Sequence, residues 1–124
     1  MTQRTILITG CSSGIGLASA RALRDRGWQV FATARTPDDL ARLKVDERLD
    51  AVHLDLADPQ SIAACAQTVL DQTGSNISAL FNNAAYGQPG AIEDVPTDAL
   101  RAQFDVNVFG THDLTRRIIS VIFF

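Results

Sequence analysis

Cysteine is scarce in this sequence, and the positions of its two cysteines argue against the common uses of paired thiols. Cys11 and Cys65 are far apart and form no CxxC motif. Small disulfide-stabilised domains instead carry several closely spaced cysteines. Together with His53 and His112, the cysteines show no spacing typical of a zinc site. We therefore expect thiols in a reducing cytoplasm, and no bound metal.

Surplus positive charge and long apolar segments are also lacking. The chain has 11 Lys and Arg against 14 Asp and Glu, for a net charge of −3. Such a chain offers no overall cationic surface to nucleic acid or anionic lipid, so any anion must be held locally. No apolar run is long enough to span a membrane, and MTQRTILITG lacks a cleavage site of small residues. The sequence predicts a cytoplasmic protein without nucleic-acid or membrane partners.

What is present is one domain, residues 1–124, in which apolar strands alternate with helices. Strands without polar alternation are typical of a parallel sheet that is buried on both faces. The predicted strands are 5–9, 29–34, 51–56 and 79–82, and the predicted helices are 15–26, 37–44, 59–73 and 98 to the end. Right-handed crossovers then predict an α/β fold, a Rossmann-like doubly wound sheet with order 3-2-1-4 and helices on both faces.

Local signals mark the helix ends and faces. Asp58, before Pro59, and Thr97 are predicted N-caps, and Gly74 is predicted to end a helix. Helical spacing predicts that one side of helix 15–26 is formed by Ile15, Ala18, Ala22 and Leu23.

Three glycines stand between the first strand and the first helix, in TGCSSGIG. Gly10 permits a tight turn with positive φ, Gly14 lets backbone N–H groups approach a pyrophosphate, and Gly16 lets the helix pack closely on the sheet. The helix N-terminus adds partial positive charge, and Ser12 and Ser13 add hydroxyl donors. The alternative is a tight turn without a ligand. The position between strand and helix favours a dinucleotide site, and the absence of GK[ST] argues against a Walker loop.

The end of the second strand, FATAR, carries no acid for the ribose hydroxyls of NAD(H). Arg35 follows Ala34, and its planar donor fork suits a 2′-phosphate. The sequence therefore favours NADP(H) over NAD(H); the alternative is an arginine that is simply solvated at a strand end.

These stretches resemble the short-chain dehydrogenase/reductase family. TGCSSGIG is similar to its TGxxxGIG loop, HLDL to its adenine-contacting segment, NNAA to its NNAG, and DVNVFG to the helix that bears its active-site Asn. The resemblance spans essentially the whole chain and implies hydride transfer between a nicotinamide and a small-molecule carbonyl or alcohol.

The resemblance also implies roles for individual residues. Asp55 would accept from the adenine amino group with Leu56 beside the ring, and Asn82 and Ala84 would lie along the adenine ribose. The alternatives are that Asp55 stabilises a turn and that the asparagines bond nearby backbone. The implied cofactor-binding set is Thr9, Gly10, Ser12, Ser13, Gly14, Ile15, Gly16, Arg35, Asp55, Leu56, Asn82 and Ala84. Ala85 replaces the family's usual Gly and would be crowded if its φ were positive.

Asn107 matches the family's active-site Asn, which helps to hold a water in a proton relay. Its spacing predicts an apolar helix stripe made of Leu100, Phe104, Asn107, Thr111, Leu114 and Ile118. On such a stripe an unpartnered amide would cost about 1–3 kcal/mol, so a satisfied core Asn is the alternative to the catalytic one.

The rest of the implied catalytic set is missing. In the family a tyrosine exchanges the proton, a lysine four residues later lowers the tyrosine's pKa, and a serine orients the substrate. This chain has one tyrosine, Tyr86, and one lysine, Lys44, and Gly90 stands four residues after Tyr86. We expect the cofactor half of an oxidoreductase, truncated before the Ser and YxxxK segments and inactive alone. A non-catalytic dinucleotide sensor and a structural domain that does not use the loop are the alternatives.

The last predicted helix is apolar on more than one side. Its additional apolar residues are Val106, Val108, Phe109, Ile119, Val121, Ile122, Phe123 and Phe124. A helix that is apolar all round is normally buried. The sequence therefore predicts a homo-oligomer that associates through 98–124, and the alternative is a frayed terminus.

Overall fold

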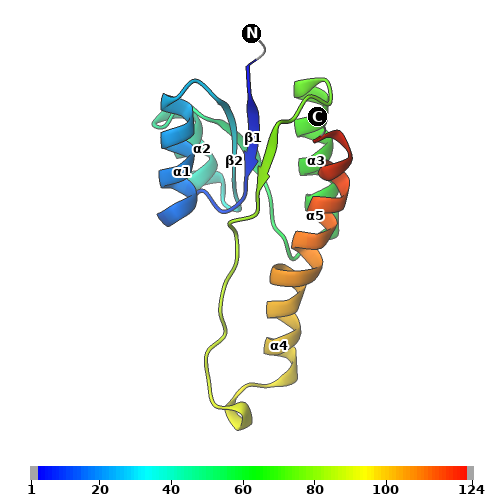
Figure 1. The fold of residues 1–124 in the computed structure, drawn as a ribbon. Helices are drawn as coiled ribbons and strands as arrows, with labels where there is room; N and C mark the ends of the chain where they lie inside the picture. Colours follow the sequence, from blue (N-terminus) through cyan, green and yellow to red (C-terminus); the bar gives the residue numbers. More distant parts are fainter. Residues whose placement is uncertain (1–2, 123–124) are drawn as a thin grey trace.

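Four parallel strands form one sheet in the computed structural model, which describes residues 3–122 (Figure 1). The strands are β1 (Thr5–Ile8), β2 (Gln29–Ala34), β3 (Asp50–His53) and β4 (Ala79–Phe81). Their order is β3-β2-β1-β4, which confirms the predicted order 3-2-1-4. Ile6 pairs with Val30 on one side and with Ala79 on the other. Because all the strands run the same way, their carboxyl ends gather at one edge.

Helices cover both faces of this sheet (Figure 1). One face carries α1 (Gly14–Asp25) and α2 (Pro37–Val45), and the other carries α3 (Pro59–Thr73) and α5 (Thr111–Ile118). Successive strand residues point to opposite faces. Ile6 and Ile8 therefore enter the core beneath α1 and α2, while Leu7 enters the core beneath α3 and α5. The prediction of strands buried on both faces is confirmed for β1 and β2, whereas β3 exposes Asp50 and His53 and β4 is half-buried.

Three strands end earlier than predicted: β1 ends at Ile8, one residue early, and β3 and β4 also end short. Leu54 still donates its N–H to the carbonyl oxygen of Ala34 at 3.0 Å, but the chain then turns, with the N–H of Asp58 donating to the Asp55 carbonyl at 3.0 Å. This turn replaces the last residues of the predicted strand 51–56. β4 ends at Phe81 instead of at residue 82.

The buried side of α1 differs from the predicted one. The exposed members of the predicted side are Ile15, Ala18 and Ala22. Leu23 packs against the core as expected, but the buried residues of the helix are Gly16 and Ala20. Small residues let a helix lie close to its neighbours while contributing little apolar area. A hydrophobic pattern is therefore a poor guide to this face.

Two of the three predicted helix caps are confirmed. Asp58 caps α3 by accepting from the N–H of Gln60 at 2.9 Å, and Gly74 ends the helix at φ 60°. Thr97 was predicted as a cap, which is wrong: Pro96 occupies the N-cap position, with extended φ and ψ. The Pro96 carbonyl accepts the first helical N–H groups, so the helix starts one residue earlier.

The long helix predicted from residue 98 is interrupted. After a short 3₁₀ turn, Ile92–Asp94, the chain forms α4 (Thr97–Phe104), the π-helix η2 (Asp105–Gly110), α5 and a 3₁₀ turn (Ile119–Val121). In Figure 1, α4 extends beyond the sheet while α5 lies against it. Within the described residues, no helix combines the length and apolarity that a membrane crossing requires.

The predicted apolar stripe divides at the π-helix. Leu114 and Ile118 are fully buried, but Leu100 and Phe104 are 48% and 45% exposed. The prediction of this stripe assumes 3.6 residues per turn throughout, and the π-helix interrupts that period. Val121 and Ile122 pack partly against the core, whereas Phe123 and Phe124 lie outside the described residues.

Candidate functional site

A cavity of about 740 Å³ opens at the carboxyl edge of the sheet. Its walls come from the β1–α1 loop, the end of β2, the β3–α3 turn, the segment after β4, and the junction of α4 with η2. The predicted site residues that line it are Gly10, Ser12, Ser13, Arg35, Asp55, Leu56 and Ala84. In open α/β sheets, this edge is where ligands bind.

Gly10 makes the turn from β1 into this cavity. Its φ is +70°, and a Cβ at this position would lie 3.0 Å from the Cα and Cβ of Ala84. Its N–H donates to Oγ1 of Thr33 at 3.1 Å, and the N–H of Cys11 donates to the Thr33 carbonyl at 2.9 Å. Glycine is needed here for both the backbone conformation and the close approach.

Thr9 and Asn83 tie the glycine loop to the segment after β4. Oγ1 of Thr9 accepts from the N–H groups of Asn83 and Ala84 at 3.0 and 2.9 Å. Nδ2 of Asn83 donates back to the carbonyls of Thr9 and Gly10 at 3.2 and 3.1 Å. Thr9 is 1% exposed and does not line the cavity, so its part is structural. The predicted site residues include Asn82 but not Asn83, its neighbour in the same NN pair.

The start of α1 carries the other predicted loop residues. Gly14 has φ +59° and open space around its Cα, and Ile15 is 72% exposed. A Cβ at Gly16 would stand 2.1 Å from the Gly10 carbonyl oxygen and 2.6 Å from Nδ2 of Asn83. Gly16 thus allows a close approach, as predicted, but to the Gly10 carbonyl and the Asn83 side chain and not to the strands of the sheet.

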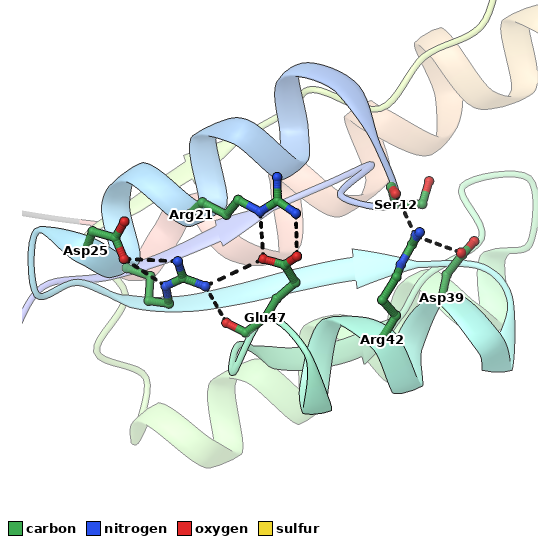
Figure 2. A network of polar contacts seen from close by, with 7 residues as sticks. Ser12, Arg21, Asp25, Asp39, Arg42 and Glu47 are labelled. Atoms are coloured by element: carbon green, nitrogen blue, oxygen red, sulfur yellow. Dashed lines mark hydrogen bonds and ion pairs between the residues drawn. The ribbon is translucent and has the colours of Figure 1, made fainter.

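Arginines stand on the β2 side of the cavity. Arg35 is exposed and lines the cavity beside Ser12 and Ser13. Arg42, which the sequence reasoning missed, donates to the Ser12 carbonyl at 2.7 Å and to Oδ1 of Asp39 at 2.9 Å (Figure 2). Its position in α2 gave no sign in the sequence that it reaches the glycine loop.

Asp55 closes the turn after β3. Its Oδ1 accepts from the N–H of Ala57 at 2.9 Å, and its own N–H donates to Oγ of Ser61 at 2.8 Å. The turn-stabilising alternative is thus observed, while the side chain also lines the cavity. A carboxylate has two oxygens, so the turn leaves one of them free for a ligand. Leu56 is 6% exposed and forms part of both the core and the cavity wall.

Asn82 and Ala85 differ from what the sequence suggested. Nδ2 of Asn82 donates to Oγ1 of Thr115 at 2.9 Å, so its side chain joins α5 and is not among the cavity-lining residues. Within residues 3–122, Arg48 and Ser75 are the non-glycine residues with positive φ. Ala85 therefore does not have a positive φ, and the crowding that a positive φ would cause for its methyl group does not arise.

Asn107 lies within the π-helix and holds the backbone of Tyr86. Its Oδ1 accepts from the Tyr86 N–H at 3.1 Å, and its Nδ2 donates to the Tyr86 carbonyl at 2.7 Å. The amide is thus satisfied, as the structural alternative required. Asn107 does not itself line the cavity, but Tyr86 and the neighbouring Asp105 and Val106 do. Single π-turns are frequent at functional sites.

The cysteines are buried and free. Burial raises the pKa of Cys11 to about 11, against a smaller lowering by its backbone hydrogen bond to Thr33. Burial alone raises the pKa of Cys65 to about 12. With pKa values raised in this way, both groups are neutral thiols near pH 7. That neither is in a disulfide confirms the prediction of unpaired thiols.

Comparison with known proteins gives a consistent match. The family described as short chain dehydrogenase matches residues 4–122. An uncharacterized oxidoreductase of Escherichia coli, YbbO, is 39% identical over 117 residues, covering 94% of this chain and 43% of the relative. The chain therefore spans less than half the length of that curated relative.

Solved structures agree with the fold. A short-chain dehydrogenase from Streptomyces avermitilis superposes with a TM-score of 0.87 at 36% identity, over 96% of this chain and 44% of that one. The NADPH-bound carbonyl reductase from chicken fatty liver gives 0.85 at 26% identity, over 96% and 48% of the two chains.

Proposed function

This chain belongs to the short-chain dehydrogenase family, and from that premise we propose that it is the cofactor-binding half of an NADP(H)-dependent oxidoreductase. The nicotinamide supplies the hydride that such an enzyme exchanges with a carbonyl or alcohol. The glycine loop and the N-terminus of α1 bind the pyrophosphate, with Gly14 leaving the approach open. Asp55 accepts from the adenine amino group, and Asn107 fixes the segment that carries Tyr86.

The observation that carries the choice of cofactor is the position of Arg35 at the cavity. Ala34 and Arg35 line the wall where an NAD(H) site would place its acid. Within the described residues Arg35 forms no ion pair, so its charge is available to a 2′-phosphate. NADPH in the chicken carbonyl reductase is consistent with this proposal.

Titration calorimetry with NADPH and NADH tests the proposal. We expect tighter binding of NADPH, and a reversed preference in Arg35→Asp after a change of about 1–3 kcal/mol, the value of a charge-assisted contact. Arg26→Asp, at the opposite end of α1, makes the same charge change away from the cavity and should leave the preference unaltered. Equal affinity of the unaltered chain for both cofactors would show that Arg35 does not discriminate.

We further propose that these 124 residues bind cofactor without turnover. Their single tyrosine, Tyr86, has no lysine four residues later, so the tyrosine–lysine pair that exchanges the proton in the family is missing from them. With a panel of ketones and aldehydes, NADPH should be consumed at the buffer rate. A steady rate that disappears in Tyr86→Phe would reveal a proton donor that this reasoning missed.

A homodimer is the third part of the proposal. Apolar side chains of α4 and η2 remain exposed, with Phe104 at 45% and Phe109 at 62%, beside a shallow hollow that Leu100 also lines. Light scattering at micromolar concentration should give twice the chain mass, and Phe109→Glu should give a monomer. Val45→Glu replaces an apolar residue that is 71% exposed on α2 and serves as control. A monomeric unaltered chain would refute the dimer.

A further inference from the structure

The two halves of the glycine loop are held by different parts of the molecule. Hydrogen bonds hold the first half, Thr9, Gly10 and Cys11. They come from the side chains and backbone of Thr33, which is buried, and Asn83, which is half-buried. The second half, Ser12 and Ser13, projects toward the cavity. Within the described residues, one hydrogen bond connects Ser12 and Ser13 to an element other than α1. In that bond, Arg42 of α2 donates to the Ser12 carbonyl.

Arg42 is itself held in place. Nη2 donates to the Ser12 carbonyl at 2.7 Å and to Oδ1 of Asp39 at 2.9 Å, so both hydrogens of that nitrogen are used (Figure 2). Thr36 caps α2 by accepting from the Asp39 N–H at 3.2 Å, which places Asp39 in the first turn of the helix. A series of contacts therefore links Thr36 at the start of α2, through Asp39 and Arg42, to Ser12 in the glycine loop.

Arg42 and Arg35 differ in whether their charge is paired. Arg42 pairs with the carboxylate of Asp39, so little net charge remains to attract a phosphate. Arg35 has no ion pair within residues 3–122 and lines the cavity, whereas Arg42 does not line it. A residue that holds the loop without touching the ligand affects every ligand of that loop equally.

We propose that Arg42 is a positioning residue for dinucleotide binding: it anchors Ser12, and through it the approach to the pyrophosphate, without distinguishing NADP(H) from NAD(H). This proposal rests on the proposed function, because it assumes that the glycine loop binds a dinucleotide. It assigns discrimination to Arg35 and loop placement to Arg42, two arginines on the same side of the cavity with separable effects.

Calorimetric titration of the full chain with NADP⁺ and NAD⁺ tests this assignment. Arg42→Ala should weaken both cofactors by the same factor, about tenfold for one charge-assisted hydrogen bond. Arg42→Lys retains a donor and should recover part of the loss, whereas Arg35→Ala should weaken NADP⁺ alone. A loss confined to NADP⁺ in Arg42→Ala would overturn the proposal, because Arg42 would then be a direct phosphate ligand. Unchanged affinity for both cofactors would overturn it as well.

Amide hydrogen exchange of the cofactor-free protein supplies a second readout. In Arg42→Ala the amide of Leu17, which donates to the Ser13 carbonyl at 3.3 Å, should exchange faster, while the amides in β1 should be unchanged. Arg21→Ala is the matched control: it removes a surface ion pair to Glu47, on the same face of the molecule but away from the loop (Figure 2). Unchanged exchange at Leu17 would refute the anchoring.

The two measurements also separate this inference from the proposed function. If the unaltered chain bound neither dinucleotide, the proposed function would fail, and with it the role of Arg42 in binding. Faster exchange in Arg42→Ala would then show that the anchor exists without that role. If the chain bound both and Arg42→Ala changed nothing, only the inference would fail.

Discussion

Gly110 provides the sharpest steric test of how the cavity is built. It is buried at the end of η2, and a Cβ at this position would lie 2.1 Å from the Leu56 carbonyl oxygen and 2.9 Å from the Asp105 carbonyl oxygen. Real Cβ atoms essentially never approach closer than 3.0 Å. Gly110→Ala must therefore displace either the helix or the β3–α3 turn, which carries Asp55, Leu56 and Ala57 into the cavity wall.

The cost can be estimated from two opposing effects. Forcing an extra methyl group into a packed site costs about 1–3 kcal/mol, and the upper end applies because the obstructing oxygen is backbone. Replacing glycine by alanine in a helix returns about 1 kcal/mol. We expect Gly110→Ala to lower the free energy of unfolding by about 2 kcal/mol, which corresponds to a melting temperature about 8 °C lower for a domain of this size.

Thermal and urea unfolding, followed by circular dichroism, measure this loss. Gly87→Ala is the matched control, since a Cβ there would have nothing within 4 Å. It should change stability by at most about 1 kcal/mol, in the stabilising direction. Cofactor affinity should fall in Gly110→Ala alone, because only that change moves the cavity wall. Equal stability of the two variants would refute the close approach of η2 to the turn after β3.

Three further outcomes follow from individual contacts. Asn107→Ala removes both hydrogen bonds to the Tyr86 backbone; urea unfolding should show a loss of about 1–3 kcal/mol, and the Tyr86 amide should exchange faster. Asp58→Ala removes the cap of α3 and should cost about 1 kcal/mol in the same assay. The folded-state pKa values of Cys11 and Cys65, about 11 and about 12, exceed the ordinary 9.0, so their contribution to stability is complete below pH 9. Above pH 9 the unfolded thiols ionise first, and stability measured against pH should fall through the folded pKa values; replacing both cysteines by alanine should remove that part of the pH dependence.

Much of the fold could be predicted because its signals are local and strong. β2 occupies the predicted residues 29–34, and Asp58 and Gly74 delimit α3 as expected. Each of these features depends on a few adjacent residues that favour one local structure: an apolar strand, an N-cap or a helix end. Strand order then followed from the handedness of parallel crossovers, which the sequence need not encode in detail.

Two of the errors involve contacts that hydrophobic spacing does not record. α1 buries Gly16, which lies close to the Gly10 carbonyl oxygen and Nδ2 of Asn83, and Ala20, which packs in the core. Hydrophobic spacing records apolar area but not such proximity. The π-helix breaks the stripe at Asn107, where the amide bonds to Tyr86, a residue 21 positions away. No periodicity within 98–118 could have indicated that partner.

Contacts between segments remote in sequence also explain why the candidate site could be predicted only in part. Residues that face the cavity, such as Gly10, Arg35 and Asp55, lie in motifs that are recognisable by themselves. Those that fix the walls do so by bonding to another segment's backbone: Asn83 reaches Gly10, and Arg42 reaches Ser12. These bonds shape the proposed dinucleotide site using groups within this chain, whereas the implied proton transfer needs a tyrosine–lysine pair that these residues do not contain. The contacts of these residues therefore bear on the binding that we propose, and the turnover assay with ketones and aldehydes tests the chemistry separately.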